Sequence, residues 1–329
     1  MPNTTVQLRT SNGRFVCAEG GGGQPLVANR NAALEWESFV LIDLHGGTLL
    51  DGHQVALQAV NGQFVCAEGG GGREVVPNRD AIGPWETFTL HKVNGTGAVV
   101  DGDAIALQAN NGQHVCAEGG GGGPVVANRD LIGPWETFLI SVLPPRHVRI
   151  EVESVHCADT EDVLGADELY LVGAAASRTN VTGKPILTKP ISINNGQTRS
   201  FPVDQRVMFD GEVDVATTIS VGLRAYDEDA NRDWSNYGSM ITKMGDDLAN
   251  GLKELKPVGV VAGTVLKLGI GAAGLIMSLD QDDELGELAV DLPVITLPRP
   301  TSTRTWRFRE TGIGFSTWDY TLRYRISVG

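Results

Sequence analysis

NGQFVCAEGGGGREVVPNRDAIGPWETF, residues 61–88, is one of three copies of a stretch that dominates the first half of this chain. The other two copies begin at Asn12 and Asn111, and offsets of 49 and 50 residues between successive copies leave almost no room for insertions. A period of this length is the signature of a fold assembled from equivalent units. The repeat therefore indicates the architecture of the first half more directly than it indicates a ligand.

Each copy predicts four short strands. The runs VQLRT, VALQAV and IALQAN alternate in polarity and lead into Asn-Gly pairs, which favour hairpin turns because both residues tolerate positive φ. A glycine loop, a third strand, a polar turn and a fourth strand follow. Twelve strands in three equivalent sets are typical of a β-trefoil. We therefore expect residues 1–144 to form a β-trefoil with three internal repeats.

The repeat resembles the fascin-like branch of the β-trefoils. The motif NG-x-[FH]-VCAEGGGG, the NR-[ND] turn and the GPWETF strand carry the resemblance over residues 5–143, although the first copy has Leu34-Glu35 where the others have Gly-Pro. Fascin-like trefoils occur in actin-bundling proteins of animals and as single modules attached to secreted bacterial enzymes. The resemblance thus implies binding of actin or another protein as one possible function.

Aromatic and charged residues recur at equivalent positions of the copies. Trp36, Trp85 and Trp135, each followed three residues later by a phenylalanine (Phe39, Phe88, Phe138), are expected to fill or cap the core. The arginine of each copy is expected to pair with one of two glutamates. The candidate pairs join Arg30 to Glu19 or Glu37, Arg79 to Glu68 or Glu86, and Arg129 to Glu118 or Glu136.

The four-glycine loops at 20–23, 69–72 and 119–122 are the candidate ligand sites. Glycine lets a ligand approach backbone N–H groups closely, but no Lys-Ser/Thr pair follows, so these are not P-loops. We expect sugar binding, with up to three sites that act together; the alternative is a scaffold whose repeats only close the barrel. The candidate residues are Asn12, Glu19, Gly21, Asn29, Asn61, Glu68, Gly70, Asn78, Asn111, Glu118, Gly120 and Asn128.

The second half, residues 146–329, follows the linker-like pair Pro144-Pro145. Alternating runs such as VRIEVESVHCAD and the closing WDYTLRYRISVG predict an antiparallel β-sandwich with one solvated face on each sheet. The segment Asp167-Glu168-Leu169-Tyr170 after an acidic turn resembles C2-type sandwiches and bacterial sandwich domains of the DE-x-Y kind. A mostly β chain of two domains is therefore expected.

Acidic residues gather after the strand-like runs of this half. Calcium requires six to eight oxygen ligands, which carboxylates from several loops supply, whereas ordinary solvated turns are the alternative. The candidate calcium ligands are Asp159, Asp167, Asp227, Asp229, Asp282 and Asp283, with Asp162, Glu168, Asp233 and Asp280 close by in the sequence.

A helical insertion is expected at about 240–279. Met240 to Leu255 is amphipathic, and residues 258–279 are apolar except for Lys267. That second stretch reaches the length of a membrane span, so segment 257–279 is either a helix packed on the sandwich or the insertion element of a pore-forming toxin. Its five glycines weaken it as an independent span.

The net charge of -14 repels nucleic acid. An anionic membrane surface is also unfavourable, although a membrane partner stays open through segment 257–279. The start MPNTTVQLRTSNG has no signal-peptide pattern, and Cys17, Cys66, Cys116 and Cys157 are expected to be free buried thiols. We therefore expect a cytoplasmic protein, with leaderless secretion as the alternative.

Catalytic motifs are absent from the sequence. The six histidines form no HExxH or other familiar metal spacing, and neither GxSxG nor a Rossmann fingerprint occurs. We expect a non-enzymatic, lectin-like protein that binds a glycan through the trefoil, with a second domain that is calcium-binding or membrane-proximal. The alternatives are an actin-binding or protein-binding module and a pore-forming toxin.

Overall fold

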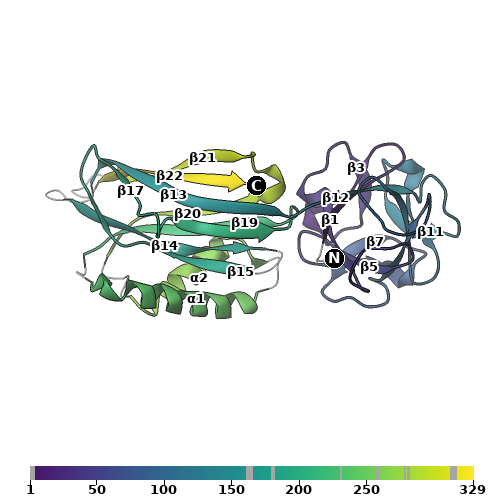
Figure 1. The fold of residues 1–329 in the computed structure, drawn as a ribbon, viewed down its shortest axis with the longest axis horizontal. Helices are drawn as coiled ribbons and strands as arrows, with labels where there is room; N and C mark the ends of the chain where they lie inside the picture. Colours follow the sequence, from purple (N-terminus) through teal and green to yellow (C-terminus); the bar gives the residue numbers. More distant parts are fainter. Residues whose placement is uncertain are drawn as a thin grey trace. The chain divides into compact units, whose positions relative to one another are not determined.

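The computed structural model describes residues 4–160, 166–178, 182–229, 232–255, 259–277, 279, 282–311 and 317–329. The chain forms two compact units, Met1–Pro145 with Asp214–Thr217, and Arg146–Val213 with Thr218–Gly329. Strands predominate in both units (Figure 1), which confirms the prediction of a mostly β chain. The Pro144-Pro145 pair lies where the main segment of the first unit ends.

The first unit contains twelve strands, four from each copy of the repeat. They are β1 (Thr4–Arg9), β2 (Phe15–Cys17), β3 (Val27–Arg30), β4 (Ser38–Asp43), β5 (Gln54–Gln58), β6 (Phe64–Ala67), β7 (Val75–Arg79), β8 (Phe88–Lys92), β9 (Ala104–Gln108), β10 (His114–Ala117), β11 (Val125–Arg129) and β12 (Phe138–Leu143). Strands β1, β4, β5, β8, β9 and β12 pair in that order, and β12 returns to β1, so they close a barrel. The other six form three hairpins, β2–β3, β6–β7 and β10–β11.

The barrel closes around one phenylalanine from each copy. Phe39, Phe88 and Phe138 are fully buried and pack with inward-facing residues of the barrel strands, such as Val55 and Leu57. Each buried aromatic of this kind stabilises the fold by about 1.5–3 kcal/mol. The Asn-Gly hairpins and the alternation of strand residues thus account for the barrel.

The tryptophans correct one expectation, because they do not fill the core. The exposed fractions of Trp36, Trp85 and Trp135 are 37%, 42% and 44%. The phenylalanine three residues later already occupies the barrel interior. Each indole lies instead beside the second glycine of its own loop, and a Cβ placed on Gly70 would be 3.1 Å from Trp85 Nε1.

The glycine loops join successive copies. All four glycines of the second loop have positive φ, which side-chain-bearing residues rarely adopt. A Cβ on Gly71 would lie 2.1 Å from the Asn111 side chain, so only glycine fits there. The same contact joins the first loop to Asn61 and the third loop to Asn12, so the three copies form a closed cycle.

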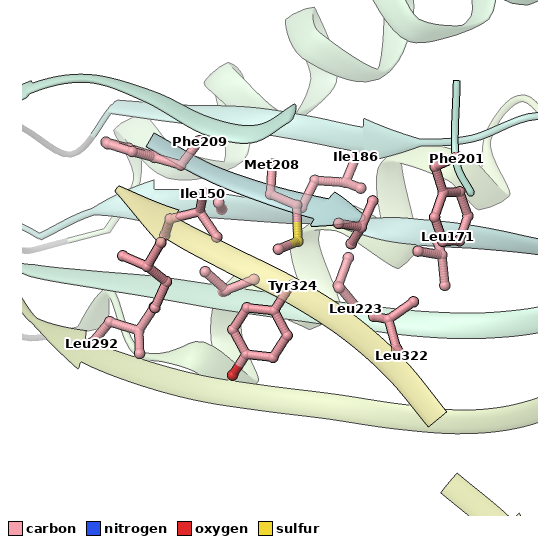
Figure 2. Close-up of a cluster of buried hydrophobic side chains, with 14 of the residues drawn as sticks. Ile150, Leu171, Ile186, Phe201, Met208, Phe209, Leu223, Leu292, Leu322 and Tyr324 are labelled. Atoms are coloured by element: carbon pink, nitrogen blue, oxygen red, sulfur yellow. The ribbon is translucent and has the colours of Figure 1, made fainter. Parts of the chain in front are cut away.

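The second unit contains two antiparallel sheets of five strands each. One consists of β13 (Arg146–Asp159), β17 (Thr198–Ser200), β18 (Val207–Val213), β21 (Thr301–Glu310) and β22 (Trp318–Val328). The other consists of β14 (Asp167–Ser177), β15 (Thr182–Leu187), β16 (Ile191–Ile193), β19 (Thr218–Asp227) and β20 (Asp283–Pro293). Side chains from both sheets form one core; Figure 2 shows Ile150, Leu322 and Tyr324 facing Leu171 and Leu223.

Two helices cover the other face of the β14–β19 sheet (Figure 1), which corrects the expectation of a solvated face there. Helix α1 (Tyr237–Lys253) turns Met244, Leu248 and Leu252 inward, and α2 (Ala262–Gly274) lies on β14 and β19. Strand β14 is therefore buried on both faces, except for Glu168. These helices correspond to the expected insertion, of which residues 256–258 and 278 lie outside the described part of the chain.

Glycines bring α2 very close to the sheet. A Cβ on Gly269 would lie 2.5 Å from the carbonyl carbon of Gly173, and a Cβ on Gly222 would lie 2.4 Å from the Cβ of Leu266. The small residues of this apolar stretch therefore serve packing within the unit. Over the residues that the structure describes, no helix combines the length and the apolar character needed to cross a bilayer.

Candidate functional site

The glutamates and arginines of the repeat form one charged cluster in each copy. Arginine Nη2 lies 2.6, 3.1 and 2.8 Å from Glu19, Glu68 and Glu118, respectively. The second expected partner, Glu37, Glu86 or Glu136, lies farther from the same guanidinium at 3.6, 3.9 and 3.9 Å. Both predicted pairings of each arginine are therefore present. Asn29, Asn78 and Asn128 belong to the same clusters, each in a hydrogen bond with the adjacent arginine or the glutamate.

The other predicted ligand residues lie where copies meet. The carbonyls of Gly21, Gly70 and Gly120 accept the backbone N–H groups of Asn61, Asn111 and Asn12, at 3.1, 2.9 and 3.3 Å. Six of the twelve residues predicted to bind sugar, namely these three glycines and three asparagines, thus join successive copies. The other six belong to the charged cluster within each copy.

The acidic residues of the second unit are occupied by protein donors. Asp167 is fully buried and accepts the Tyr320 hydroxyl, whose pKa is raised by burial and by this bond. Asp159 accepts Thr317 Oγ1 at 2.9 Å, and Asp227 accepts the backbone N–H of Glu168 at 2.6 Å. These three carboxylates therefore bind donors in separate contacts.

Asp282 lies at the end of the sheet beside an arginine. It accepts the Tyr170 hydroxyl and pairs with Arg232, and the Asp229 N–H donates to it at 3.2 Å. The Arg232 guanidinium therefore compensates the charge of Asp282 in this structure, and calcium binding stays a prediction. Asp283 pairs in register with Asp227 on the neighbouring strand and is exposed. Asp162 and Asp280 lie outside the described residues.

A polar pocket of ≈ 430 Å³ lies between the second and third copies. Its lining residues are Gln54, Pro84, Thr87, Thr89, Gln108, Ala109, Asn110 and Gly112. None of them is charged. A volume of this size is within the range of small-molecule sites, and the amides and hydroxyls offer both donors and acceptors.

The floor of the pocket is a row of side chains across three barrel strands. Thr89 on β8 is paired with Gln54 on β5 and with Gln108 on β9, and all three alternate with buried neighbours. Side chains opposite one another on antiparallel strands lie about 5 Å apart. Gln108 is fixed by donating to the Gly112 carbonyl at 2.8 Å. The row therefore presents amide, hydroxyl and amide groups in a rigid order.

The same row differs at the other two junctions of the barrel. It consists of Thr5, Val40 and Gln58 at one, and of Ala104, Leu139 and Arg9 at the other. An aliphatic side chain thus replaces Thr89 in both places. The fully polar row belongs to the junction of the second and third copies alone.

Trp85 directly follows Pro84, which lines this pocket. A Cβ on Gly70 would be 3.1 Å from Trp85 Nε1 and 3.6 Å from Asn110 Oδ1, so the indole and this pocket residue both lie near the same glycine. Trp36 has Val60 near the equivalent glycine, and Trp135 has Ser11. The junction that has the fully polar row is therefore also the one where an amide side chain, that of Asn110, lies near an exposed indole.

Sequence reasoning missed these pocket residues. Gln54, Thr89 and Gln108 lie on three different strands, and a polar residue on the outer face of a strand looks like an ordinary solvated position. Position-by-position comparison of the copies contains the signal, because Thr89 stands where the other copies have Val40 and Leu139.

Comparisons with known proteins give the following similarities. A family model described as "Domain of unknown function (DUF7910)" matches residues 46–98. No curated protein matches the chain significantly.

A ricin B-like lectin from Macrolepiota procera in complex with lactose is a similar solved structure. It is 16% identical, with coverage of 42% of this chain and 94% of the lectin and a TM-score of 0.32. The BEL β-trefoil is 12% identical, with coverage of 43% and 93% and a TM-score of 0.33. A mosquitocidal holotoxin is 11% identical, with coverage of 70% of this chain and 26% of the toxin and a TM-score of 0.35.

Proposed function

We propose that the first unit is a β-trefoil of fascin-like type that binds a neutral carbohydrate, without catalysis, in the pocket between its second and third copies. The observation that supports this most strongly is the row Gln54–Thr89–Gln108 on the pocket floor. The cytoplasmic location of the protein stays a prediction.

The chemistry of the lining favours a sugar over other small ligands. Sugar hydroxyls both donate and accept hydrogen bonds, as the amides of Gln54 and Asn110 and the hydroxyl of Thr89 do. A phosphate or a carboxylate would lack a cationic partner among the lining residues. The half-exposed indole of Trp85 offers an apolar face against which the C–H groups of a sugar ring can pack.

A glycan array tests the proposal with the full chain. Wild type is expected to bind a discrete set of neutral glycans, and Thr89→Val is expected to lose them, because the substitution removes the hydroxyl at nearly constant volume. The proposal is overturned if the wild-type array is blank, or if Thr89→Val binds the same glycans equally well. A parallel array with a calcium chelator tests the calcium prediction, since loss of binding there would move the site to the second unit.

A protein partner is the second candidate, because the third copy exposes an apolar ridge. Leu131 is 82% exposed, and Ile132 and Trp135 lie beside it in the same turn. Actin co-sedimentation of the full chain tests the filament-binding form of this candidate. Sedimentation that is lost in Leu131→Ser would support it over sugar binding.

The toxin alternative has a direct test of its own. Helix α2 would have to leave the sheet in order to enter a bilayer. In the structure it packs closely on the sheet, where Gly173, Gly222 and Gly269 lie at the contact. Leakage from liposomes exposed to the full chain would favour the alternative, and intact liposomes at every pH tested would remove it.

A further inference from the structure

Asp43, His45 and His53 present three potential metal ligands at one end of the barrel. Asp43 ends strand β4, and His53 immediately precedes its hairpin partner β5. The loop between the two strands carries His45 back over the carboxylate. One ligand atom from each of the three residues lies within 4.8 Å of the others.

The carboxylate is held rigidly, while the imidazoles are accessible. The Asp43 side chain is 2% exposed and accepts the backbone N–H of His45 at 3.0 Å. The side chain of His53 is 17% exposed and that of His45 is 49% exposed. The two rings stack with their centroids 4.6 Å apart. An ion arriving from solvent can therefore reach both rings and meet a fixed anionic ligand behind them.

The spacing suits a small transition-metal ion. Zinc binds nitrogen and oxygen at about 2.0–2.2 Å in tetrahedral sites, which places neighbouring ligand atoms about 3.3 Å apart. His53 Nδ1 lies 3.1 Å and His45 Nδ1 lies 3.9 Å from the nearest Asp43 oxygen, so the two distances bracket that value. We propose that Asp43, His45 and His53 bind a divalent transition-metal ion such as zinc, with the fourth coordination position left to water or to another ligand.

The second copy shows which side chains the barrel needs at the positions of Asp43, His45 and His53. In the second copy, Lys92 and Asp103 occupy the positions of Asp43 and His53 and form an ion pair of 2.9 Å. Asn94 stands where the first copy has His45. The fold of the barrel therefore does not require a histidine at any of these positions. The first copy has one carboxylate and two imidazoles in place of this ion pair, which is a typical zinc donor set.

Other ligand-type residues of the described chain do not form an equivalent group. His91 and His114 have ring centroids 6.0 Å apart and contact Gln108 and a backbone carbonyl instead of a carboxylate. His147 pairs with Asp210 at 3.0 Å, a histidine–carboxylate pair with no second histidine. The cysteines are fully buried, and burial raises the pKa of the Cys66 thiol to about 12. The first-copy cluster is the one place among the described residues where three such groups converge.

The test uses Zn²⁺ and Co²⁺ on the full chain after treatment with a chelator. Calorimetry is expected to show one zinc ion per chain, and cobalt is expected to give the visible absorption of a tetrahedral site. His45→Ala and His53→Ala should each weaken binding at least tenfold, roughly the loss that removal of even a supporting partner of a ligand produces. His147→Ala, which disrupts a two-member pair, is the matched control and should bind like wild type.

Three outcomes would overturn the proposal. Wild type could bind no zinc at micromolar concentration, the His45→Ala and His53→Ala variants could bind as tightly as wild type, or His147→Ala could lose as much affinity as they do. Circular dichroism of the apo variants checks their folding, and the Lys92–Asp103 pair shows that this level of the barrel tolerates other side chains. Because the readout is metal binding alone, failure of the sugar proposal leaves this result unaffected.

Discussion

Trp36, Trp85 and Trp135 occupy equivalent positions, yet each indole has a different neighbour across the glycine loop. The neighbours are Val60, Asn110 and Ser11, respectively. An exposed indole beside an apolar side chain is a surface contact, whereas one beside an amide at the rim of a polar pocket can orient a ligand. Of the three tryptophans, only Trp85 is therefore part of the proposed ligand site.

We expect Trp85→Ala to weaken sugar binding by about fivefold, since an aromatic contact contributes about 1 kcal/mol. Trp36→Ala is the matched control, because it removes an indole of similar exposure from the apolar junction. Affinity measured by titration should change in the first variant only. Equal losses in both variants would mean that the effect reflects the stability of the first unit and not the pocket.

Glu151 on β13 gives a prediction about pH. Its side chain is 8% exposed and lies 2.9 Å from Arg149 Nη2, and the hydrogen bond from Arg149 is the main cause that lowers the pKa of the carboxyl. Because the folded pKa lies below the unfolded value of about 4.3, this stabilisation is fully present above that value. It is lost as the pH falls through the folded pKa.

Glu151→Gln should therefore destabilise the second unit by about 2 kcal/mol at pH 7, and the difference from wild type should shrink below pH 4 or so. Hydrogen exchange of the β13 and β22 amides reports the free energy of unfolding of this unit. Glu212→Gln, at an exposed position of β18, is the control and should have little effect. If the free energy of unfolding of Glu151→Gln differs from that of wild type by the same amount at pH 7 and pH 3, the lowered pKa of Glu151 does not stabilise the fold.

Single residues show where sequence reasoning succeeds and where it fails. The buried phenylalanines and the arginine–glutamate pairs follow from repetition and charge, and both were predicted. The tryptophans were placed wrongly because a large aromatic side chain is usually buried, whereas here Phe39 and its equivalents already fill the space. The histidine cluster was missed because His45 and His53 are brought together only by the hairpin that follows Asp43.

At the scale of elements, α2 shows how small residues allow a helix to lie directly on a sheet. Sequence alone left two readings of segment 257–279, because an apolar, glycine-rich stretch satisfies both a buried helix and a membrane element. The partner glycines Gly173 and Gly222 lie on β14 and β19, far away in sequence, so the close approach could not be inferred from the helix itself.

Two alanine substitutions in α2 should have opposite effects. Gly269→Ala should destabilise the second unit by about 1–3 kcal/mol, because its Cβ would meet the β14 backbone at 2.5 Å. Gly271→Ala should stabilise the same helix by about 1 kcal/mol, because no atom lies within 4 Å of its Cβ and alanine favours helix. Denaturant unfolding of both variants is the measurement. Equal effects would show that α2 does not pack in this way.

At the scale of the whole molecule, threefold repetition builds the barrel and a local difference between copies builds the site. The strand pattern, the Asn-Gly turns and the glycine loops were predictable because every copy repeats them. The pocket was not, since it depends on the register that sets Thr89 between Gln54 and Gln108. Among the recurring features, the glycine loops and the Asn-Gly turns join successive copies, and the polar row that distinguishes one junction is the proposed ligand surface.

Calorimetric titration of the best array glycan into wild type, Thr89→Val and Leu139→Thr tests this claim most directly. Leu139→Thr introduces a threonine at the equivalent position outside the pocket. We predict one site per chain in wild type, at least tenfold weaker binding in Thr89→Val and unchanged binding in Leu139→Thr. Three equivalent sites per chain, or unchanged affinity in Thr89→Val, would contradict the claim and return the ligand to the repeated glycine loops.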